Sequence, residues 1–189
     1  VSNLSLVMGV AGATLAGNSV LIAGIAGLLA GSISMALGEW LSVQSSRELY
    51  THQIETEKEE IATAPEEEAE ELALIYEARG LAPETARTLA TQIMANPNTA
   101  LDTLAREELG INPDDLGGSA WEAAITSFVL FALGAIIPVA PFIFTSGMPA
   151  VYISIVLSAL GLFGLGAAIT LFTGRSVLYS GFRMVLFGL

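Results

Sequence analysis

The sequence predicts an all-α membrane protein with five transmembrane helices and an acidic helical domain between the second and third. Its composition is 53% hydrophobic and only 14% charged, and its mean hydropathy is +0.65, outside the usual range of soluble globular proteins. Seventeen of the 19 acidic residues nevertheless fall in one block, from Glu48 to Asp115. No stretch alternates apolar and polar residues with the period of a β-strand, which favours helices throughout.

Five apolar stretches are candidate membrane spans, because crossing the hydrocarbon layer takes about 20 helical residues. They are residues 4–16, 19–37, 123–137, 151–172 and 176–189. We expect the first and the last to be truncated, since the sequence opens in one apolar run and ends inside another. Gly17 and Asn18 are expected to form a tight turn. Small residues in the second span, such as Gly24, Gly27 and Gly31, allow membrane helices to approach closely.

The chain accordingly divides into three parts. Residues 1–45 hold the first two spans, residues 46–117 form the acidic helical domain, and residues 118–189 hold the last three spans. Six of the seven basic residues lie in the acidic domain or at Arg175, and both regions are on the same side because two and four spans precede them. Basic residues are retained on the cytoplasmic side, so we expect the acidic domain to face the cytoplasm.

Proline and glycine divide the acidic domain into helices. The expected helices are residues 39–61, continuing the second span, then 65–79, 83–94 and 97–109. Pro65 suits the first position of a helix, where the three glutamates that follow it are favoured by the helix dipole. Gly80 is placed to cap the same helix at its carboxyl end. Leu72 and Leu104 are expected to lie on buried helix faces.

The acidic block excludes several classes of function. It holds 17 acidic and four basic residues, so its formal charge is −13. A field of this sign attracts cations and excludes nucleic acid as a partner. The chain has no Cys, which excludes disulfides, thiolate metal sites and thiol nucleophiles, and its single His, His52, is expected at the surface.

Glutamates repeat three residues apart on two neighbouring helices of the acidic domain. Glu57 and Glu60 share one helix face, and Glu68 and Glu71 share a face of the next. Because a turn at Pro65 favours antiparallel helices, four carboxylates are expected at one seam. Such crowding is destabilising unless a divalent cation neutralises it, and oxygen ligands suit Mg²⁺, Ca²⁺, Mn²⁺ or Fe²⁺. The alternative is an acidic face that is simply solvated.

Several segments carry the motifs of one known family. They are the run Gly-Ser-Ile-Ser-Met-Ala-Leu-Gly-Glu-Trp from Gly31 to Trp40, the segments 57–60 and 68–71, the Glu-Glu-Leu-Gly run at 107–110, and the opening residues 1–12. In this order they resemble the vacuolar iron transporter family, which includes yeast Ca/Mn-sensitivity-complementing and plant nodulin-like members. The resemblance covers essentially the whole chain.

The resemblance implies a homodimer of five-span subunits in a lipid membrane, with no enzymatic activity and no organic cofactor. Such a protein moves Fe²⁺, and often Mn²⁺, out of the cytosol in exchange for protons. The resemblance also implies metal ligands in the acidic domain at Glu57, Glu60, Glu68, Glu71 and Glu108. In the membrane it places Met35 in the translocation path.

Glu39 is a second candidate for the ion path. It stands one helical turn beyond Met35 on the same face, and ionisable groups at membrane depth are usually functional. The alternative is a position in the headgroup zone beside Trp40, an interfacial anchor.

Three features depart from the family pattern. Leu104 and Ala105 stand where members carry a methionine pair, which weakens the case for a thioether contribution to the metal site. Gly27 stands where some members carry a glutamate, and Glu39 is a candidate to replace that group. The Asp-Gly-Leu run of the first span would precede Val1 and is absent from this sequence.

Two other classes of protein fit parts of the sequence. A membrane-anchored metal buffer needs the glutamates of the acidic domain but neither Met35 nor Glu39. A structural membrane protein with an acidic interaction domain needs none of them. A di-iron oxidoreductase would need Glu-x-x-His pairs, and the sequence has none.

Overall fold

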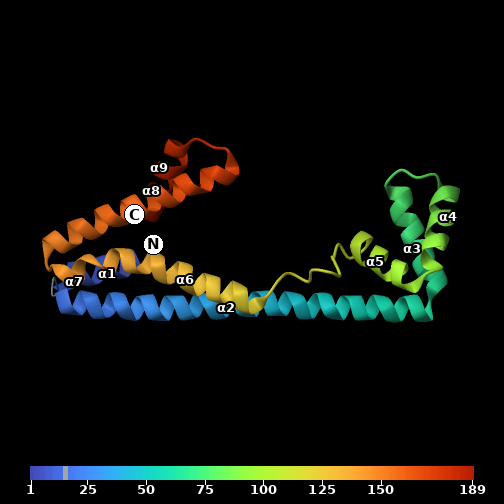
Figure 1. Cartoon of the computed structure of the whole chain (residues 1–189), viewed down its shortest axis with the longest axis horizontal. Coiled ribbons are helices and arrows are strands. Elements are labelled where there is room, and N and C mark those ends of the chain that lie inside the picture. The colour runs from blue at the N-terminus through green and yellow to red at the C-terminus, as the bar shows by residue number, and fades with distance from the viewer. Residues whose placement is uncertain (15–16) are drawn as a thin grey trace. The chain divides into compact units, whose positions relative to one another are not determined.

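A computed structural model describes residues 1–14 and 17–189, and all regular structure in that part of the chain is helical (Figure 1). The helices are α1 (Ser2–Thr14), α2 (Gly17–Thr63), α3 (Pro65–Ala78), α4 (Pro83–Met94), α5 (Pro97–Glu107), α6 (Ala120–Val139), α7 (Pro141–Phe144), α8 (Met148–Thr173) and α9 (Val177–Gly188). The predicted all-α class is confirmed. The described residues form two compact units: unit 1 is Val1–Glu39 with Ala123–Leu189, and unit 2 is Trp40–Glu122.

Three of the helices are long and apolar enough to cross a membrane, namely α2, α6 and α8. Helix α9 is apolar but has 12 residues, and α1 has 13. Residues 15–16, at the end of the predicted first span, lie outside the described residues. The predicted turn at Gly17 and Asn18 is wrong, because α2 begins at Gly17. A helix amino terminus tolerates both residue types, since its first amides lack helical partners in any case.

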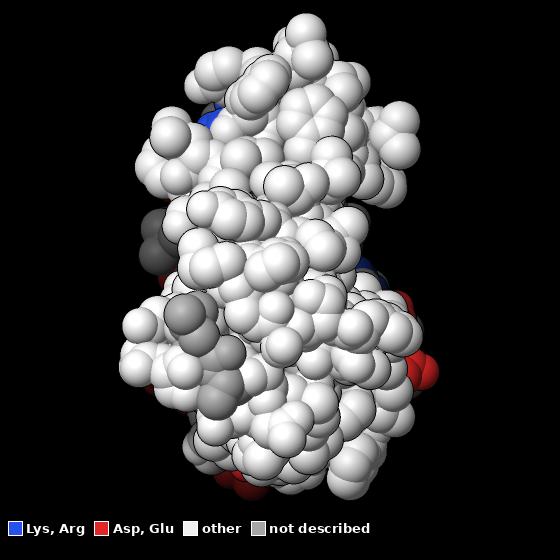
Figure 2. Space-filling view, turned by 90° about the vertical axis from the view of Figure 1, so that its left-hand side faces the viewer, with Lys and Arg blue, Asp and Glu red and all other residues white. Residues whose placement is uncertain are grey.

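The helices of unit 1 pack closely at glycines that the sequence predicts to lie at helix contacts. A Cβ at Gly24 would lie 2.7 Å from Cγ2 of Val139, and a Cβ at Gly31 would overlap the ring of Phe131, so α2 and α6 approach closely at both positions. Val139 belongs to a buried cluster with Val7 and others from α1, α2, α7 and α8. Figure 2 views unit 1 from the side that α7 occupies in Figure 1 and shows a surface with hardly any charged residue.

Two polar side chains also connect the helices of unit 1. The Asn3 amide nitrogen of α1 donates hydrogen bonds to the carbonyls of Ala135 in α6, at 2.7 Å, and Gly24 in α2, at 3.3 Å. The Ser154 hydroxyl of α8 donates to the Pro138 carbonyl of α6, at 2.7 Å. Hydrogen bonds of this kind join helices in surroundings where water does not compete.

Unit 2 folds at the boundaries that its prolines and glycines predict. Helices α3, α4 and α5 each begin with proline, and the Asn96 side chain caps α5 by accepting from the Asn98 amide. At the end of α3, Gly80 adopts a φ of +99°. Its amide donates to the Glu77 carbonyl while the Leu81 amide donates to that of Tyr76, the Schellman pattern. This arrangement turns the chain back so that α4 packs against α3.

The core of unit 2 is small and lies between α3, α4 and α5. Its buried members are Leu72, Ala73, Ala86, Ala90 and Leu104, with Ile61 of α2 packed against them. Burial of Leu72 and Leu104, both 0% exposed, is confirmed. Because alanines let helices approach closely while the two leucines fill the centre, the three short helices hold one another and the end of α2 together.

The close contact between α8 and α9 at Gly166 can be tested by substitution. A Cβ at Gly166 would lie 2.5 Å from the Ser180 carbonyl oxygen and 2.8 Å from Cα of Gly181, both backbone atoms. We expect Gly166→Ala to push α9 away and lower stability by about 1–3 kcal/mol, measured as thermal unfolding in detergent. Gly164→Ala is the matched control, because its Cβ would meet nothing within 4 Å. Equal melting temperatures for the two variants would contradict this packing.

Candidate metal site

Glu57 and Glu68 are brought together by the break between α2 and α3. Helix α2 continues the second span as the sequence predicts but runs to Thr63, two residues beyond the expected end, and Ala64 separates it from Pro65. The amide of Glu68 donates to the Ala64 carbonyl, so Glu68 sits in the first turn of α3. A carboxylate there is favoured by the helix dipole.

Glu108 reaches the same place from α5. The sequence predicts that this helix runs to Leu109, but it ends at Glu107, and Glu108 is its cap residue. The buried side chain of Leu104, one turn earlier, anchors α5 in the core of unit 2. An ion pair between Arg79, the cap residue after α3, and Glu107 also holds this end of α5. The sequence does not predict this ion pair, because the two residues are far apart in the chain and no local pattern indicates that they meet.

Three of the predicted ligands therefore meet at one point. Glu57, Glu68 and Glu108 each offer a carboxylate oxygen, and these oxygens lie within 4.8 Å of one another. Glu57 is 2% exposed and Glu68 is 6% exposed, while Glu108 borders solvent. Oε1 of Glu57 is buried without a hydrogen-bond partner among the described residues. An acceptor left unpaired in this way is costly, and a cation bound between the three groups would satisfy it.

Crowding and burial make ionisation of these groups difficult. Burial raises the pKa of Glu57 from 4.5 to about 8, and the charges of Glu108, Glu68 and Glu60 and a hydrogen bond with Glu68 act in the same direction. Burial also raises the pKa of Glu68, as do the charges of Glu71, Glu108 and Glu60, whereas the hydrogen bond with Glu57 opposes the rise. Burial, together with Glu71 and Glu60, raises the pKa of Glu108 as well.

Most cations of unit 2 are engaged elsewhere. Arg87 pairs with Glu70 at 3.2 Å, and Arg106 pairs with Asp102 at 3.0 Å and Asp114 at 2.9 Å. No basic group lowers the pKa of Glu57, Glu68 or Glu108. The three carboxyls thus lack a positive partner from the described part of the chain, which separates this cluster from an ordinary salt-bridged surface.

Glu60 and Glu71, the other two predicted ligands, have a different setting. Both side chains are exposed, and neither belongs to the group of converging oxygens. Their charges still act on the cluster, because both raise the pKa of Glu68 and Glu108. They border the site, and their role as ligands stays a prediction.

The two candidates for the ion path lie on unit 1. Met35 is 50% exposed and Glu39 is exposed, four residues apart on the same face of α2. Leu104 and Ala105, at the positions of the family's methionine pair, are both 0% exposed, and Leu104 is part of the unit 2 core. At these two positions the chain has packing residues, and the side-chain atoms that converge are all carboxylate oxygens.

The raised pKa of Glu57 predicts how the metal-free protein responds to pH. Between pH 4.5 and about 8 the folded protein holds a proton that the unfolded chain releases. This contribution to stability is fully present below pH 4.5 and is lost as the pH rises through 8. We expect the melting temperature of metal-free protein to fall between pH 5.5 and 8.5, and Glu57→Gln to flatten that decline.

The control is Glu59→Gln, which changes an exposed glutamate of the same helix and should keep the wild-type pH dependence. An unchanged decline in Glu57→Gln would show that this carboxyl is not the group that titrates.

Comparison with known proteins agrees with the motifs of the sequence. The sequence model of the VIT family matches residues 1–189. Vacuolar iron transporter 1 of Arabidopsis thaliana is 36% identical over 185 residues, which are 97% of this chain and 74% of that protein. The vacuolar iron transporter of Centaurea cyanus is 32% identical over 185 residues, with 97% and 75% covered. That of Plasmodium falciparum is 30% identical over 199 residues, with 98% and 71% covered. The chain belongs to the VIT family.

Proposed function

We propose that this protein is a transporter that moves Fe²⁺, with Mn²⁺ as a second cargo, out of the cytosol in exchange for protons. VIT family members are transporters rather than enzymes, and the relatives above are named vacuolar iron transporters. The observation that carries the proposal is the meeting of three carboxyl groups, from α2, α3 and the cap residue of α5, with no basic side chain of the described residues acting on them. The Fe²⁺ or Mn²⁺ ion is the transported substrate, and no organic cofactor is required.

Unit 2 captures the metal. Its acidic block creates a field that concentrates cations near Glu57, Glu68 and Glu108. Binding displaces the proton held by Glu57, since a carboxylate must be ionised to act as a ligand. Metal binding therefore strengthens as the pH rises, and acid favours release. Glu60 and Glu71, at the border of the site, add charge and further oxygen ligands.

Unit 1 carries the metal across the membrane. In this proposal α1 and α9 belong to the first and last of five spans, two subunits form a homodimer, and unit 2 faces the cytoplasm. The ion meets Met35 and Glu39 on the exposed face of α2. A bare divalent charge is too costly in hydrocarbon, so the ion needs ligands along the path and protons return to reset the carboxylates.

The alternative function is a membrane-anchored metal buffer. It is supported by the same carboxyl cluster, and it differs in making Met35 and Glu39 dispensable. An acidic interaction domain without transport is a further alternative, and it would leave metal binding weak. The two predictions below separate these functions.

Metal binding by unit 2 is tested by single substitutions in the cluster. We expect Glu57→Gln and Glu68→Gln to weaken Mn²⁺ binding by about tenfold or more, a loss of 1.4 kcal/mol or more, measured by calorimetry on the purified full chain. Glu84→Gln changes an exposed glutamate outside the cluster and should bind as the wild type does. Equal affinities for all variants would support a solvated acidic surface instead.

Transport is tested by flux in proteoliposomes with and without a proton gradient. We expect Met35→Ala and Glu39→Gln to reduce Fe²⁺ flux severalfold while Mn²⁺ binding by calorimetry stays unchanged. Met148→Ala is the matched control, because Met148 is exposed to a similar degree at the start of α8. Intact flux in both path variants, together with lost binding in the cluster variants, would favour the buffer.

A further inference from the structure

The two basic side chains of unit 1 both belong to the start of its last helix. Unit 1 contains three charged side chains, Glu39, Arg175 and Arg183. Gly174 ends α8 with a φ of +62°, and the chain turns back into α9 through the loop that holds Arg175 (Figure 1). Arg183 follows inside α9, about 9 Å along the helix axis from Val177 at 1.5 Å per residue. Positive charge is therefore concentrated at one end of an otherwise apolar helix.

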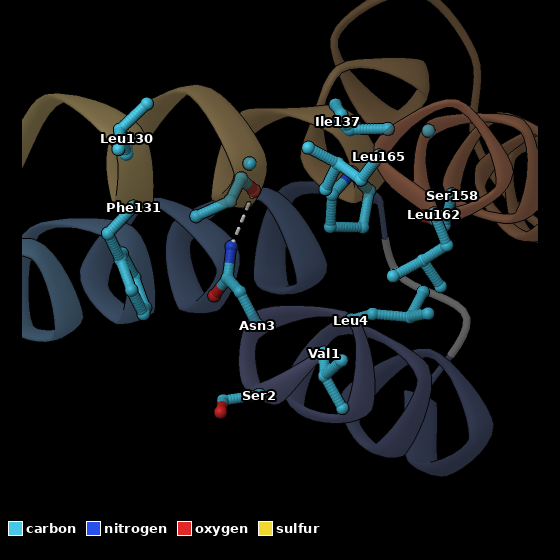
Figure 3. Close-up of a pocket in the computed structure, with 14 residues that line it drawn as sticks. Val1, Ser2, Asn3, Leu4, Leu130, Phe131, Ile137, Ser158, Leu162 and Leu165 are labelled. Carbon is cyan, nitrogen blue, oxygen red and sulfur yellow. Dashed lines mark hydrogen bonds between the residues drawn. The ribbon is translucent and has the colours of Figure 1, made fainter. Parts of the chain in front are cut away.

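Neither arginine has a negatively charged partner in the described part of the chain. Both side chains are exposed, and the ion pairs among the described residues involve other arginines. The interior of unit 1 does not supply a carboxylate: Figure 3 shows Leu4, Ile137 and Leu162 around the cavity between α1, α6 and α8, and none of the described residues that line it is acidic. Since an unpaired charge beside hydrocarbon is costly, an anion from the surroundings would stabilise this end of α9.

The side chain of Arg183 turns back toward the start of α9. Its guanidinium carbon lies 5.9 Å from the centroid of the Tyr179 ring, which is one helical turn nearer to Arg175. Helical side chains lean toward the amino terminus, and long cationic side chains reach the membrane interface in this way. Tyrosine is itself enriched at that interface. The guanidinium is thus directed toward the level of Arg175 and away from the middle of the apolar layer.

The face of α9 that carries these groups points away from α8. Ser180 and Gly181 are buried against α8, where a Cβ at Gly166 would overlap their backbone. Tyr179 and Arg183 lie on the other side of the helix and are exposed. Large apolar side chains beside them are exposed as well, namely Leu178 at 63%, Phe182 at 66% and Leu186 at 78%. A molecule bound to this face meets positive charge at one end and apolar surface along the rest.

A phospholipid with a negatively charged headgroup is complementary to both parts of this face. The planar guanidinium of arginine binds phosphate through paired hydrogen bonds, and basic residues near a membrane surface attract anionic lipids. The acyl chains would cover the exposed apolar side chains. We propose that the start of α9 binds one anionic phospholipid, with its phosphate held by Arg175 and Arg183 and its acyl chains along α9. This site requires unit 1 to lie in a membrane and is independent of transport.

The test is lipid binding to the purified full chain in detergent, measured by native mass spectrometry. We expect phosphatidylglycerol to bind at least about tenfold more tightly than phosphatidylcholine with the same acyl chains, because each arginine contributes about fivefold. Arg183→Gln and Arg175→Gln should each lower this preference severalfold, and the double variant should abolish it. Arg183→Lys keeps the charge but loses the paired hydrogen bonds, so it should retain an intermediate preference.

Arg87→Gln is the matched control. It removes the same charge from an exposed arginine of unit 2, so it should keep the wild-type preference. Because Arg175 and Arg183 are exposed without ion pairs, their variants should also melt at the wild-type temperature. Equal binding of the two lipids by the wild type, or an unchanged preference in the double variant, would overturn the proposal.

Two other partners for the arginines are separated by the same measurement. Displacement of phosphatidylglycerol by an equal concentration of inorganic phosphate would assign the arginines to a soluble anion and overturn the lipid site. The spectra also report the oligomeric state. A dimer that dissociates in Arg183→Gln while the lipid preference stays unchanged would assign Arg183 to a carboxylate of a second copy, and would overturn the proposal as well.

Discussion

The carboxyl groups of Glu57, Glu68 and Glu108 lie too close together, and two of them too far from water, to be ionised at once without a positive charge among them. Their nearest oxygens are within 4.8 Å of one another, and the pKa of Glu57 rises to about 8. Protons relieve this repulsion at low pH and a divalent cation relieves it at high pH. Competition between these two occupants is the physical basis of the metal uptake and release that we propose for this site.

The other residues of unit 2 keep these three carboxyl groups close together. Leu72 and Leu104 fix α3 and α5 in one core, while the ion pair of Arg79 with Glu107 holds the residue next to Glu108. Arg87 and Arg106 pair with carboxylates away from the cluster. Since exposed ion pairs contribute little stability, their main effect here is to leave the three central carboxyls without a partner. In unit 1, by contrast, the helices are held together by small residues that allow close packing and by a few hydrogen bonds between helices.

The features that the sequence predicts correctly are those set by residues close to one another in the chain. Pro65 and Gly80 set helix ends through their own backbone preferences, and the glutamate spacing with the intervening turn was enough to expect Glu57 near Glu68. Glu108 came only from the family resemblance, because it lies 40 residues after Glu68 and 51 after Glu57 in the chain, and its position depends on how the helices pack. Glu60 lies roughly 60° around the helix from Glu57 and is exposed, so its role as a ligand stays a prediction.

The most direct test of the central claim is the structure of the full protein loaded with Mn²⁺, with the metal located by its anomalous X-ray scattering. The account predicts a strong peak between Glu57, Glu68 and Glu108, with an oxygen of each carboxylate at bonding distance. A peak elsewhere in unit 2, or carboxylates turned outward to solvent around an empty centre, would contradict it.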